Sequence, residues 1–142
     1  MRLVDLTTKP WQLMLPGEKE TSLNKMVYLP GTLDEFGVGH EDRLDNSCHP
    51  DETTAQSFDD DVIATRFTRK HTYEGPAYFE QEITIAPADK CRTFFEIERA
   101  RCVRVYLDGE EISSYEEQTI STPHVFELTG HEGIHRLRVE SD

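Results

Sequence analysis

Adjacent carboxylates are the most frequent chemical feature of this sequence. They occur in several places, among them Asp34-Glu35, Glu41-Asp42, Asp59-Asp60-Asp61, Glu110-Glu111 and Glu116-Glu117. Two carboxylates can divide the roles of acid and base when a rigid scaffold holds them in different environments. Neighbours in loops and turns lack such a scaffold, so we expect most of these pairs to form a solvated surface. Asp34-Glu35, at the start of a long polar segment, is the exception and a candidate contact for a ligand or a partner domain.

Histidine and cysteine, the usual protein ligands of zinc, predict no metal site here. The six histidines are scattered along the chain. The grouping Cys48-His49, close to Asp51, lies in a segment without periodicity. The acidic run 59–61 lacks the spaced oxygen ligands of a calcium loop. We therefore expect neither a metal nor another cofactor.

The three cysteines make an odd count at irregular spacings, so at least one thiol is free. If the segments around Cys91 and Cys102 form one hairpin, Cys102 lies opposite Ile97, and Cys91 lies roughly 20 Å further along the strand. A disulfide between the two is then excluded, and all three cysteines are expected to have structural roles. Free thiols and the lack of a visible secretion signal favour the cytoplasm. A periplasmic or secreted location stays open if the sequence is a fragment.

The elements that must position these groups are predicted to be β-strands. No apolar stripe with helical spacing has useful length, whereas short alternating runs recur in the second half. The clearest unit is a hairpin over Cys102–Tyr115 with its turn at Asp108-Gly109. In it, the apolar positions 103, 105 and 107 face one way, Arg104 and Tyr106 face the other, and Ile112 starts the return.

Further strands are predicted at residues 11–15, 26–29, 78–85, 93–98, 125–128 and 136–140. In the last of these, Leu137 and Val139 are expected on the inner face. Seven or so short strands without crossover helices pack as two facing antiparallel sheets. The predicted fold is therefore an all-β sandwich or jelly roll.

The amino-acid composition changes between Pro30 and Ala64, where acidic residues, glycine and histidine are frequent and apolar residues are isolated. Loops of this length in a compact domain are usually functional or disordered. We expect Phe36 and Phe58 to pin part of it. Residues 1–142 are thus predicted to be one domain with a long irregular loop at about 30–64.

The charge of the chain limits its partners. It has 28 acidic and 15 basic residues, a formal net charge of -13, which repels nucleic acids and anionic membranes. Its apolar runs are far shorter than the roughly 20 residues that span a bilayer. Neither nucleic acid nor membrane is an expected partner. A nucleophile elbow, a glycine-rich phosphate loop and a basic patch with aromatic residues are also missing from the sequence.

Five stretches stand in an order that resembles a known family. They are LPGTLDEFGVG (29–39), RKHTYEGPAYFEQEITI (69–85), RVYLDGEEI (104–112), STPHVFELT (121–129) and HRLRVESD (135–142). Together, over about Trp11–Val139, they resemble the N-terminal sugar-binding domain of glycoside hydrolase family 2. This group includes bacterial β-galactosidases, β-glucuronidases and β-mannosidases.

The resemblance implies a galactose-binding-like jelly roll in a longer retaining glycosidase. In that protein an immunoglobulin-like sandwich and a (β/α)₈ barrel follow, and the barrel carries out the chemistry on a β-glycoside. A barrel of this kind needs about 250 residues, so the present chain does not contain it. We expect no catalytic residue here. The implied partners are the other domains of the parent enzyme and, through it, a carbohydrate.

The resemblance also indicates site residues. Glu74, just before a predicted strand, is the leading candidate for a sugar contact, although β-galactosidases of the family tend to carry an amide near this position. Tyr73 could stack on a pyranose ring or pack in the fold. Asp34 and Glu35 could line the entrance of the barrel, and His124 faces either the barrel or the edge of the sheet.

The residues after Glu74 are expected to belong to the core. Gly75-Pro76 forces an extended entry into the next strand, after which Tyr78 or Phe79 enters the space between the sheets.

Two other functions are open at this level. One is a free-standing carbohydrate-binding module, which needs coplanar exposed aromatic residues, whereas Trp11 is expected in the core. The other is a purely structural interaction domain that touches no sugar.

Overall fold

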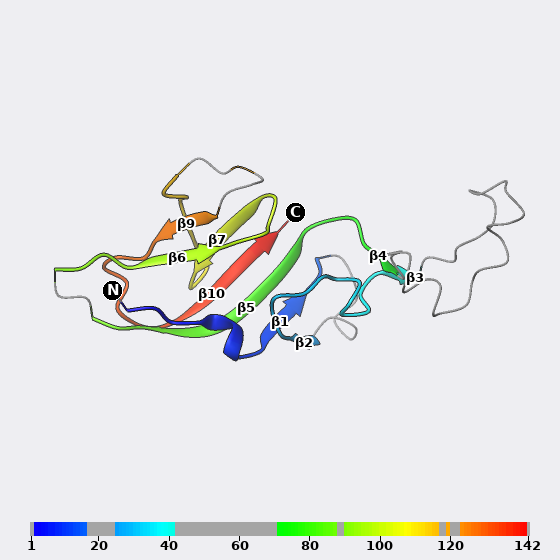
Figure 1. Cartoon of the computed structure of the whole chain (residues 1–142), viewed down its shortest axis with the longest axis horizontal. Helices are drawn as coiled ribbons and strands as arrows, with labels where there is room; N and C mark the ends of the chain where they lie inside the picture. Colours follow the sequence, from blue (N-terminus) through cyan, green and yellow to red (C-terminus); the bar gives the residue numbers. More distant parts are fainter. Residues whose placement is uncertain are drawn as a thin grey trace, which may run out of the picture. The chain divides into compact units, whose positions relative to one another are not determined.

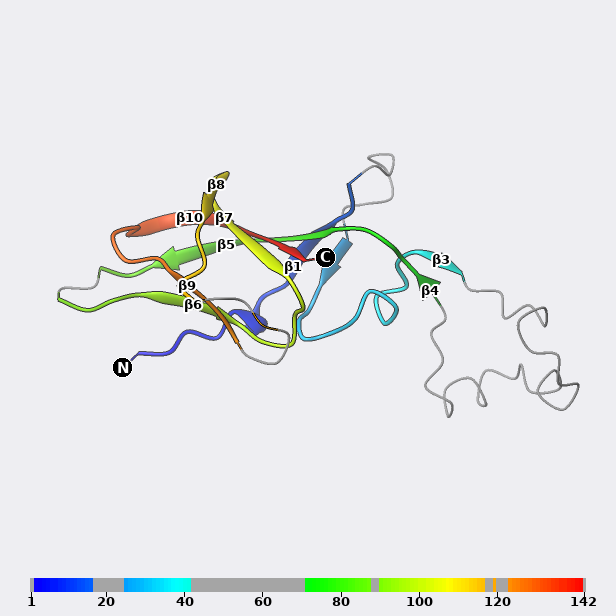
Figure 2. The ribbon, with the colours of Figure 1, turned by 90° about the horizontal axis from the view of Figure 1, so that it is seen from above.

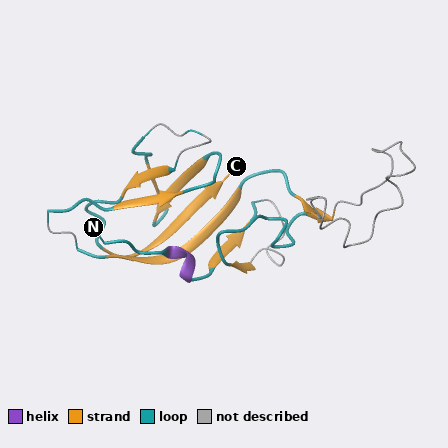
Figure 3. Ribbon diagram, viewed as in Figure 1, coloured by secondary structure: helices purple, strands orange, loops and turns teal. Residues whose placement is uncertain are grey.

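The computed structural model describes residues 2–16, 25–41, 71–87, 90–116, 119 and 123–141. These residues form ten β-strands and one short 3-10 helix, η1 (Leu6–Thr8), as Figure 3 shows by colour. The all-β prediction is therefore confirmed. The chain divides into two compact units, Met1–Leu29 with Gly75–Asp142, and Pro30–Glu74. No helix in the described part of the chain is long and apolar enough to cross a membrane.

The larger unit contains a six-stranded antiparallel sheet in the order β2-β1-β5-β10-β7-β8 (Figure 1). The strands are β1 (Trp11–Met14), β2 (Lys25–Val27), β5 (Ala77–Ile85), β7 (Val103–Leu107), β8 (Glu110–Ile112) and β10 (Gly133–Ser141). The nine residues of β5 and β10 pair over their full length, from Gly133 opposite Ile85 to Ser141 opposite Ala77. These two central strands hold the rest of the sheet in register.

A second sheet consists of β6 (Phe94–Ile97) and β9 (His124–Glu127), paired antiparallel. Figure 2 shows these two strands on one side of the larger sheet. Phe95 and Phe126 lie opposite each other in the pair, with ring centroids 6.3 Å apart, and both are buried. Alternation buries every second side chain of the facing strands, as a two-layer sandwich requires.

The buried apolar core of this unit draws on both sheets. Its members are Trp11, Leu13, Leu15, Val27, Ala77, Ile83, Ile85, Phe95, Val103, Val105, Leu107, Phe126, Leu128, Leu137 and Val139. Core positions were therefore predicted correctly for Trp11, for the inner face of the hairpin and for Leu137 and Val139.

The hairpin of β7 and β8 has the predicted turn. Asp108 and Gly109 both have positive φ, 51° and 91°. This is the requirement of a type I′ turn, whose twist matches that of the flanking strands. The Asp108 carboxylate also accepts a hydrogen bond from the Arg136 amide at 2.8 Å and lies 2.6 Å from His135 Nδ1. The turn is thus attached to β10 as well as to its own strands.

The predicted pairing of Ile97 with Cys102 is wrong. β6 pairs with β9, where Ile97 lies opposite His124, and β7 pairs with β10 and β8. The chain therefore passes from one sheet to the other between β6 and β7 instead of turning back within one sheet. Cys91 and Cys102 are free, in agreement with the expectation that they form no disulfide with each other, and both are exposed. Cys48 lies outside the described residues.

The strand β5 departs from simple alternation. Phe79 lies opposite the core residues Leu13 and Val139. It is only half-buried, as is Tyr78, so neither aromatic residue belongs to the fully buried core that was predicted for one of them. Tyr78 faces the other side, where the Arg138 guanidinium lies 5.5 Å from its ring. Glu80, on that same side, is buried and forms an ion pair with Arg138. A buried carboxylate is tolerated here because this charged partner satisfies it.

The smaller unit contains the strand pair β3 (His40–Glu41) and β4 (His71–Thr72). Before β3, residues 33–37 form a turn closed by the backbone bonds Gly37 N to Asp34 O, 2.8 Å, and Val38 N to Leu33 O, 2.9 Å. Phe36 packs near Gly31, where an added Cβ would come within 2.5 Å of its ring. Phe58 and the rest of the predicted loop after residue 41 lie outside the described residues.

Candidate functional site

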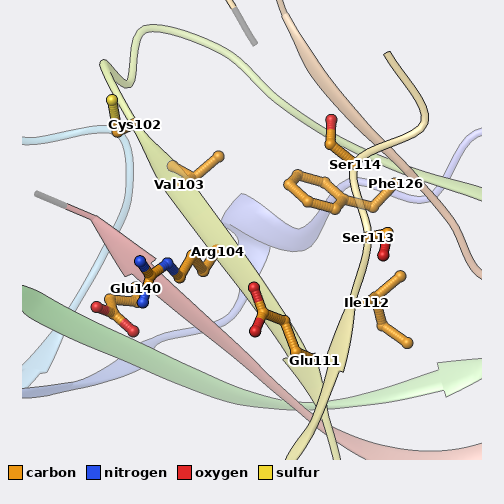
Figure 4. Close-up of a pocket in the computed structure, with 9 residues that line it drawn as sticks. All are labelled: Cys102, Val103, Arg104, Glu111, Ile112, Ser113, Ser114, Phe126 and Glu140. Carbon is orange, nitrogen blue, oxygen red and sulfur yellow. The ribbon is translucent and has the colours of Figure 1, made fainter. Parts of the chain in front are cut away.

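A cavity of about 320 Å³ opens in the larger unit where β8 ends. β8 pairs with β7 only as far as Ile112 opposite Val105. Two residues later, Ser114 forms a bridge with Phe126 of β9. The chain thus leaves one sheet for the other, and the gap forms the pocket in Figure 4. It is lined by Cys102, Val103, Arg104, Glu111, Ile112, Ser113, Ser114, Phe126 and Glu140.

Strand register brings the charged residues of this pocket together. Glu140 lies directly opposite Arg104, and Glu111 lies directly opposite Tyr106. Arg104 and Tyr106 are two residues apart on one strand and therefore share a face. Figure 4 shows the Arg104 guanidinium beside Glu140, with the Glu111 carboxylate on the other side of the Arg104 backbone. We call Arg104, Tyr106, Glu111 and Glu140 the charged cluster.

Part of the charged cluster is fixed by hydrogen bonds. The Tyr106 hydroxyl donates to Glu140 Oε2 at 3.0 Å. Burial, and then this bond, raise the pKa of Tyr106. The pKa of Arg104 is also raised, first by its hydrogen bond with Tyr106 and further by the charges of Glu140 and Glu111. At neutral pH the cluster therefore presents a neutral phenol and a positive guanidinium.

Two further polar groups of the pocket differ in their hydrogen bonding. Within the part of the chain that the structure describes, no hydrogen bond is donated to the exposed Glu111 carboxylate, and the exposed Ser113 hydroxyl makes none. Ser114 Oγ, by contrast, donates to Glu116 O at 2.6 Å. Among the described residues, the lining of the pocket therefore includes both hydrogen-bonded side chains and an exposed carboxylate and hydroxyl.

The predicted residues Asp34 and Glu35 have partners inside the smaller unit. Asp34 Oδ1 accepts a hydrogen bond from the His71 amide at 2.8 Å and lies 3.2 Å from His71 Nδ1, so it attaches the turn to β4. Glu35 Oε2 accepts from the Thr32 amide at 2.7 Å, and the Glu35 amide donates to Thr32 Oγ1 at 3.2 Å. This reciprocal arrangement is that of a capping box. Both carboxylates therefore stabilise the turn.

Tyr73 and Glu74 follow β4 directly in the same unit as Asp34 and Glu35. Tyr73 is half-buried and Glu74 is exposed. His124 belongs to the larger unit and is only 1% exposed, with its Nε2 2.9 Å from the Ala100 carbonyl. Its Nδ1 has no hydrogen-bond partner in the described part of the chain. This is the environment of a core histidine, and the other predicted residues remain accessible to different degrees.

A second group of polar and aromatic side chains lies on the outer face of the small sheet. Arg92 forms a two-point ion pair with Glu127, with Nε to Oε1 at 2.8 Å, and its guanidinium lies 5.0 Å from the ring centroids of both Phe94 and Tyr115. This pairing lowers the pKa of Glu127 to about 2. The two rings are exposed, 5.3 Å apart and inclined at 69°. They do not form a flat platform.

His131 and His135 stand four residues apart, a spacing that brings side chains together on helices. Here the two rings meet edge to face with centroids 6.3 Å apart, and His135 is engaged by Asp108. Among the described residues, no three His, Cys, Asp or Glu side chains form a group that could hold a metal ion.

The charged cluster was missed at the level of sequence. Alternation placed Arg104 and Tyr106 on one face, but it gave no information on which residues lie opposite them. The signal that was present was the high density of charge along β7 and β10, whose outward positions carry Arg104, Arg138 and Glu140.

The described fold is thus that of an antiparallel β-sandwich with a small polar pocket at its edge. No protein-family model matches the sequence. No curated protein is similar to it either. The fold is similar to part of a solved structure, a β-glucuronidase from Faecalibacterium prausnitzii, with a TM-score of 0.54 and 16% sequence identity.

The structural match covers 94% of this chain and 20% of that chain. The present chain therefore spans about a fifth of the length of the β-glucuronidase. At this level of identity the match shows a shared fold.

Proposed function

We propose that this chain is the non-catalytic jelly-roll domain of a β-galactosidase-like glycoside hydrolase of family 2. The single observation that carries the proposal is the fold match, which takes in nearly all of this chain and a fifth of a β-glucuronidase. β-Glucuronidases are members of the family that the five sequence stretches resemble. The order of the motifs and the fold, two separate properties, both support this proposal.

In this proposal the domain takes no part in the chemical reaction and contributes by where it lies in the parent enzyme. It packs against the catalytic barrel, and the segment that ends in Tyr73 and Glu74 forms part of the wall of the carbohydrate pocket. Glu74 is exposed and its carboxylate could accept hydrogen bonds from sugar hydroxyls. Asp34 supports the wall indirectly, since it binds the amide of His71 three residues earlier. Glu35 maintains the turn that carries Asp34.

A free-standing binding module with an aromatic platform is less well supported. The exposed rings of Phe94 and Tyr115 are inclined at 69°, so they cannot both stack on the same flat sugar chain. Trp11, the one tryptophan, is 3% exposed. A purely structural domain differs from our proposal only in the role of Glu74.

The complete coding sequence tests the proposal first. We expect it to encode a (β/α)₈ barrel beyond this domain, with two carboxylates at the carboxyl ends of barrel strands. An open reading frame that contains only this sandwich, or joins it to an unrelated domain, would refute the proposal.

The role of Glu74 is tested in that full-length enzyme. We expect Glu74→Ala to lower kcat/KM by more than about threefold, equivalent to roughly 0.7 kcal/mol of transition-state stabilisation. Glu98→Ala is a matched control, because Glu98 is also exposed and lies beyond the end of β6. If both variants retain the activity of the unaltered enzyme, the domain is structural and Glu74 does not contact substrate.

A further inference from the structure

The six-stranded sheet of the larger unit has two faces, and the small sheet lies on one of them (Figure 2). The other face, which we call the outward face, carries the side chains that alternate with the buried core residues of the sheet. Several of them are exposed, including Met26, at 57%, and Ile134, at 68%. We propose that the outward face binds the same face of a second copy of this chain and forms a two-fold symmetric dimer. This inference does not rest on the proposed hydrolase role, whose leading site residue, Glu74, belongs to the smaller unit.

The outward face is far less acidic than the chain as a whole. Strand register gives its charged members as Arg104, Arg136, Arg138, Glu80, Glu82, Glu111 and Glu140. Three positive and four negative charges leave a net charge of -1 on the described strands, whereas the whole chain carries -13. Two copies therefore repel each other least when they approach through this face.

The two central strands separate these charges into columns. Arg136 and Arg138 lie on β10, directly opposite Glu82 and Glu80 on β5. A two-fold axis that runs along the strands, midway between β5 and β10, places β10 of one copy over β5 of the other. Arg138 of each copy then lies over Glu80 of the second copy, and Arg136 lies over Glu82. Every contact is made twice, as in an isologous dimer.

The outer strands also match under this axis, because three strands lie on each side of it. β1 lies over β7 of the second copy, and β2 lies over β8. Met26 then faces Glu111, and Tyr78 faces Glu140, whose carboxylate can accept a hydrogen bond from the phenol. On the outward face of the described strands, this axis places no two like charges over each other.

Other two-fold axes fit less well. An axis across the strands places β10 over β10, so that Arg136 of one copy approaches Arg138 of the other. An axis between β10 and β7 places Glu80 over Glu111. Like charges in direct opposition cost several kcal/mol at an interface. An axis between β1 and β5 leaves β7 and β8 outside the contact, so the central axis is the one that the charges favour.

The area of the outward face is sufficient for a weak dimer. Its strands have three to nine residues, and at about 3.4 Å per residue and about 4.8 Å between strands the face measures roughly 550 Å². A dimer would bury roughly 1,100 Å² in total, just above the roughly 1,000 Å² expected of a biological interface. Met26 and Ile134 provide exposed apolar surface, while the ion pairs mainly determine orientation.

The first test is sedimentation velocity of the 142-residue chain over a range of about 5–500 µM. The buffer contains about 0.15 M salt, where the Debye length of about 8 Å screens repulsion between the acidic remainders of the two copies. We expect a reversible equilibrium between monomer and dimer, with a Kd of the order of 10–100 µM. Backbone amide NMR shifts that change on dilution should lie on the strands of the large sheet.

A charge exchange tests the predicted symmetry. Arg136→Glu and Glu82→Arg change two exposed residues that face each other across the interface. Each variant alone should dimerise at least about tenfold more weakly, because like charges then meet in this row. An equimolar mixture should form a heterodimer about as tight as the unaltered dimer, since one chain brings two carboxylates to the row and the other brings two guanidinium groups.

Matched controls carry the same charge changes outside the outward face. Glu96→Arg lies on β6 of the small sheet, and Arg101→Glu precedes β7; both residues are exposed. These variants should dimerise like the unaltered chain. If Arg136→Glu or Glu82→Arg loses the dispersed amide spectrum of a folded protein, Met26→Glu replaces it, because it sets a carboxylate over Glu111 and should also weaken the dimer about tenfold.

The proposal is overturned if the chain stays monomeric over this concentration range, which would leave the outward face to another domain or partner. It is also overturned if the mixed variants do not associate, or if the control variants weaken the dimer as much as the interface variants. These outcomes leave the proposed hydrolase role intact, because that role is tested through Glu74 and the complete coding sequence.

Discussion

Phe126 is the residue through which the small sheet should contribute most to stability. Its side chain is 1% exposed, and its ring lies against that of Phe95. An aromatic side chain buries at least about 150 Å², which at about 25 cal/mol per Å² corresponds to roughly 4 kcal/mol. This agrees with the loss of about 3–5 kcal/mol usually found for Phe→Ala in a core. We therefore expect Phe126→Ala to lower the free energy of unfolding by about 4 kcal/mol.

The assay is urea denaturation followed by circular dichroism, with thermal unfolding as a second measurement. A loss of this size should reduce Tm by about 10–20 °C in a chain of this length. Val125→Ala is the matched control, because Val125 is the neighbouring residue on β9 and is only half-buried. It should cost about 1 kcal/mol or less. Equal losses for the two variants would refute the alternation that assigns Phe126 to the interior.

Two further predictions concern the β7–β8 turn. The hydrogen bonds that Asp108 accepts from the Arg136 amide and from His135 lower the pKa of Asp108. The hydrogen bond with Asp108 raises the pKa of His135. The stabilisation from His135 is complete below its ordinary pKa of 6.5 and is lost as the pH rises through its raised pKa. The stabilisation from Asp108 is complete above its ordinary pKa of 3.8 and is lost as the pH falls through its lowered pKa. Urea midpoints should therefore differ most between unaltered protein and His135→Gln from about pH 4 to 6.5, and a difference that grows above pH 7 would contradict this. Gly109→Ala should cost about 1–2 kcal/mol because φ is 91°, whereas Gly109→Asn should cost less; unchanged stability of Gly109→Ala in the same assay would count against the turn.

Local features of the fold were predictable from the sequence because their causes are local. Asp108-Gly109 is a dipeptide that adopts positive φ at low cost, and the turn appears where it stands. The alternation of Val105 and Leu107 with Arg104 and Tyr106 also follows from the two-residue period of a strand. Neither inference requires knowledge of a distant partner.

The pairing of β6 was not predictable in the same way. β7 follows β6 closely in the chain, and both alternate correctly for a hairpin, so proximity favoured the wrong partner. The actual partner, β9, is separated from β6 by the 26 residues 98–123. Arg99 adopts a positive φ of 60° in the connection, where the chain leaves the small sheet for the large one. Nothing in the residue type marks this position, because arginine is not typical of that conformation.

In the candidate site, too, features with local causes were predictable and features that depend on distant residues were not. Glu74 lies just before β5, as the local interruption at Gly75-Pro76 predicted, and it is exposed, while its contact with a sugar stays a prediction. The engagement of Asp34 by His71, across 37 residues, could not be read from the sequence. The burial of Glu80 depends likewise on Arg138, which lies opposite only because β5 and β10 pair in one particular register.

The polar pocket exists because one short strand ends early. β8 pairs with β7 for three residues, and the same segment reaches β9 at Ser114, so the change of sheet is completed within two residues. If β8 continued along β7, its backbone would occupy the space beside Arg104 and close the cavity. The charged residues would then form an ordinary ladder on an exposed sheet face. The cavity at this edge therefore depends on strand length and register, which determine the residues that line it.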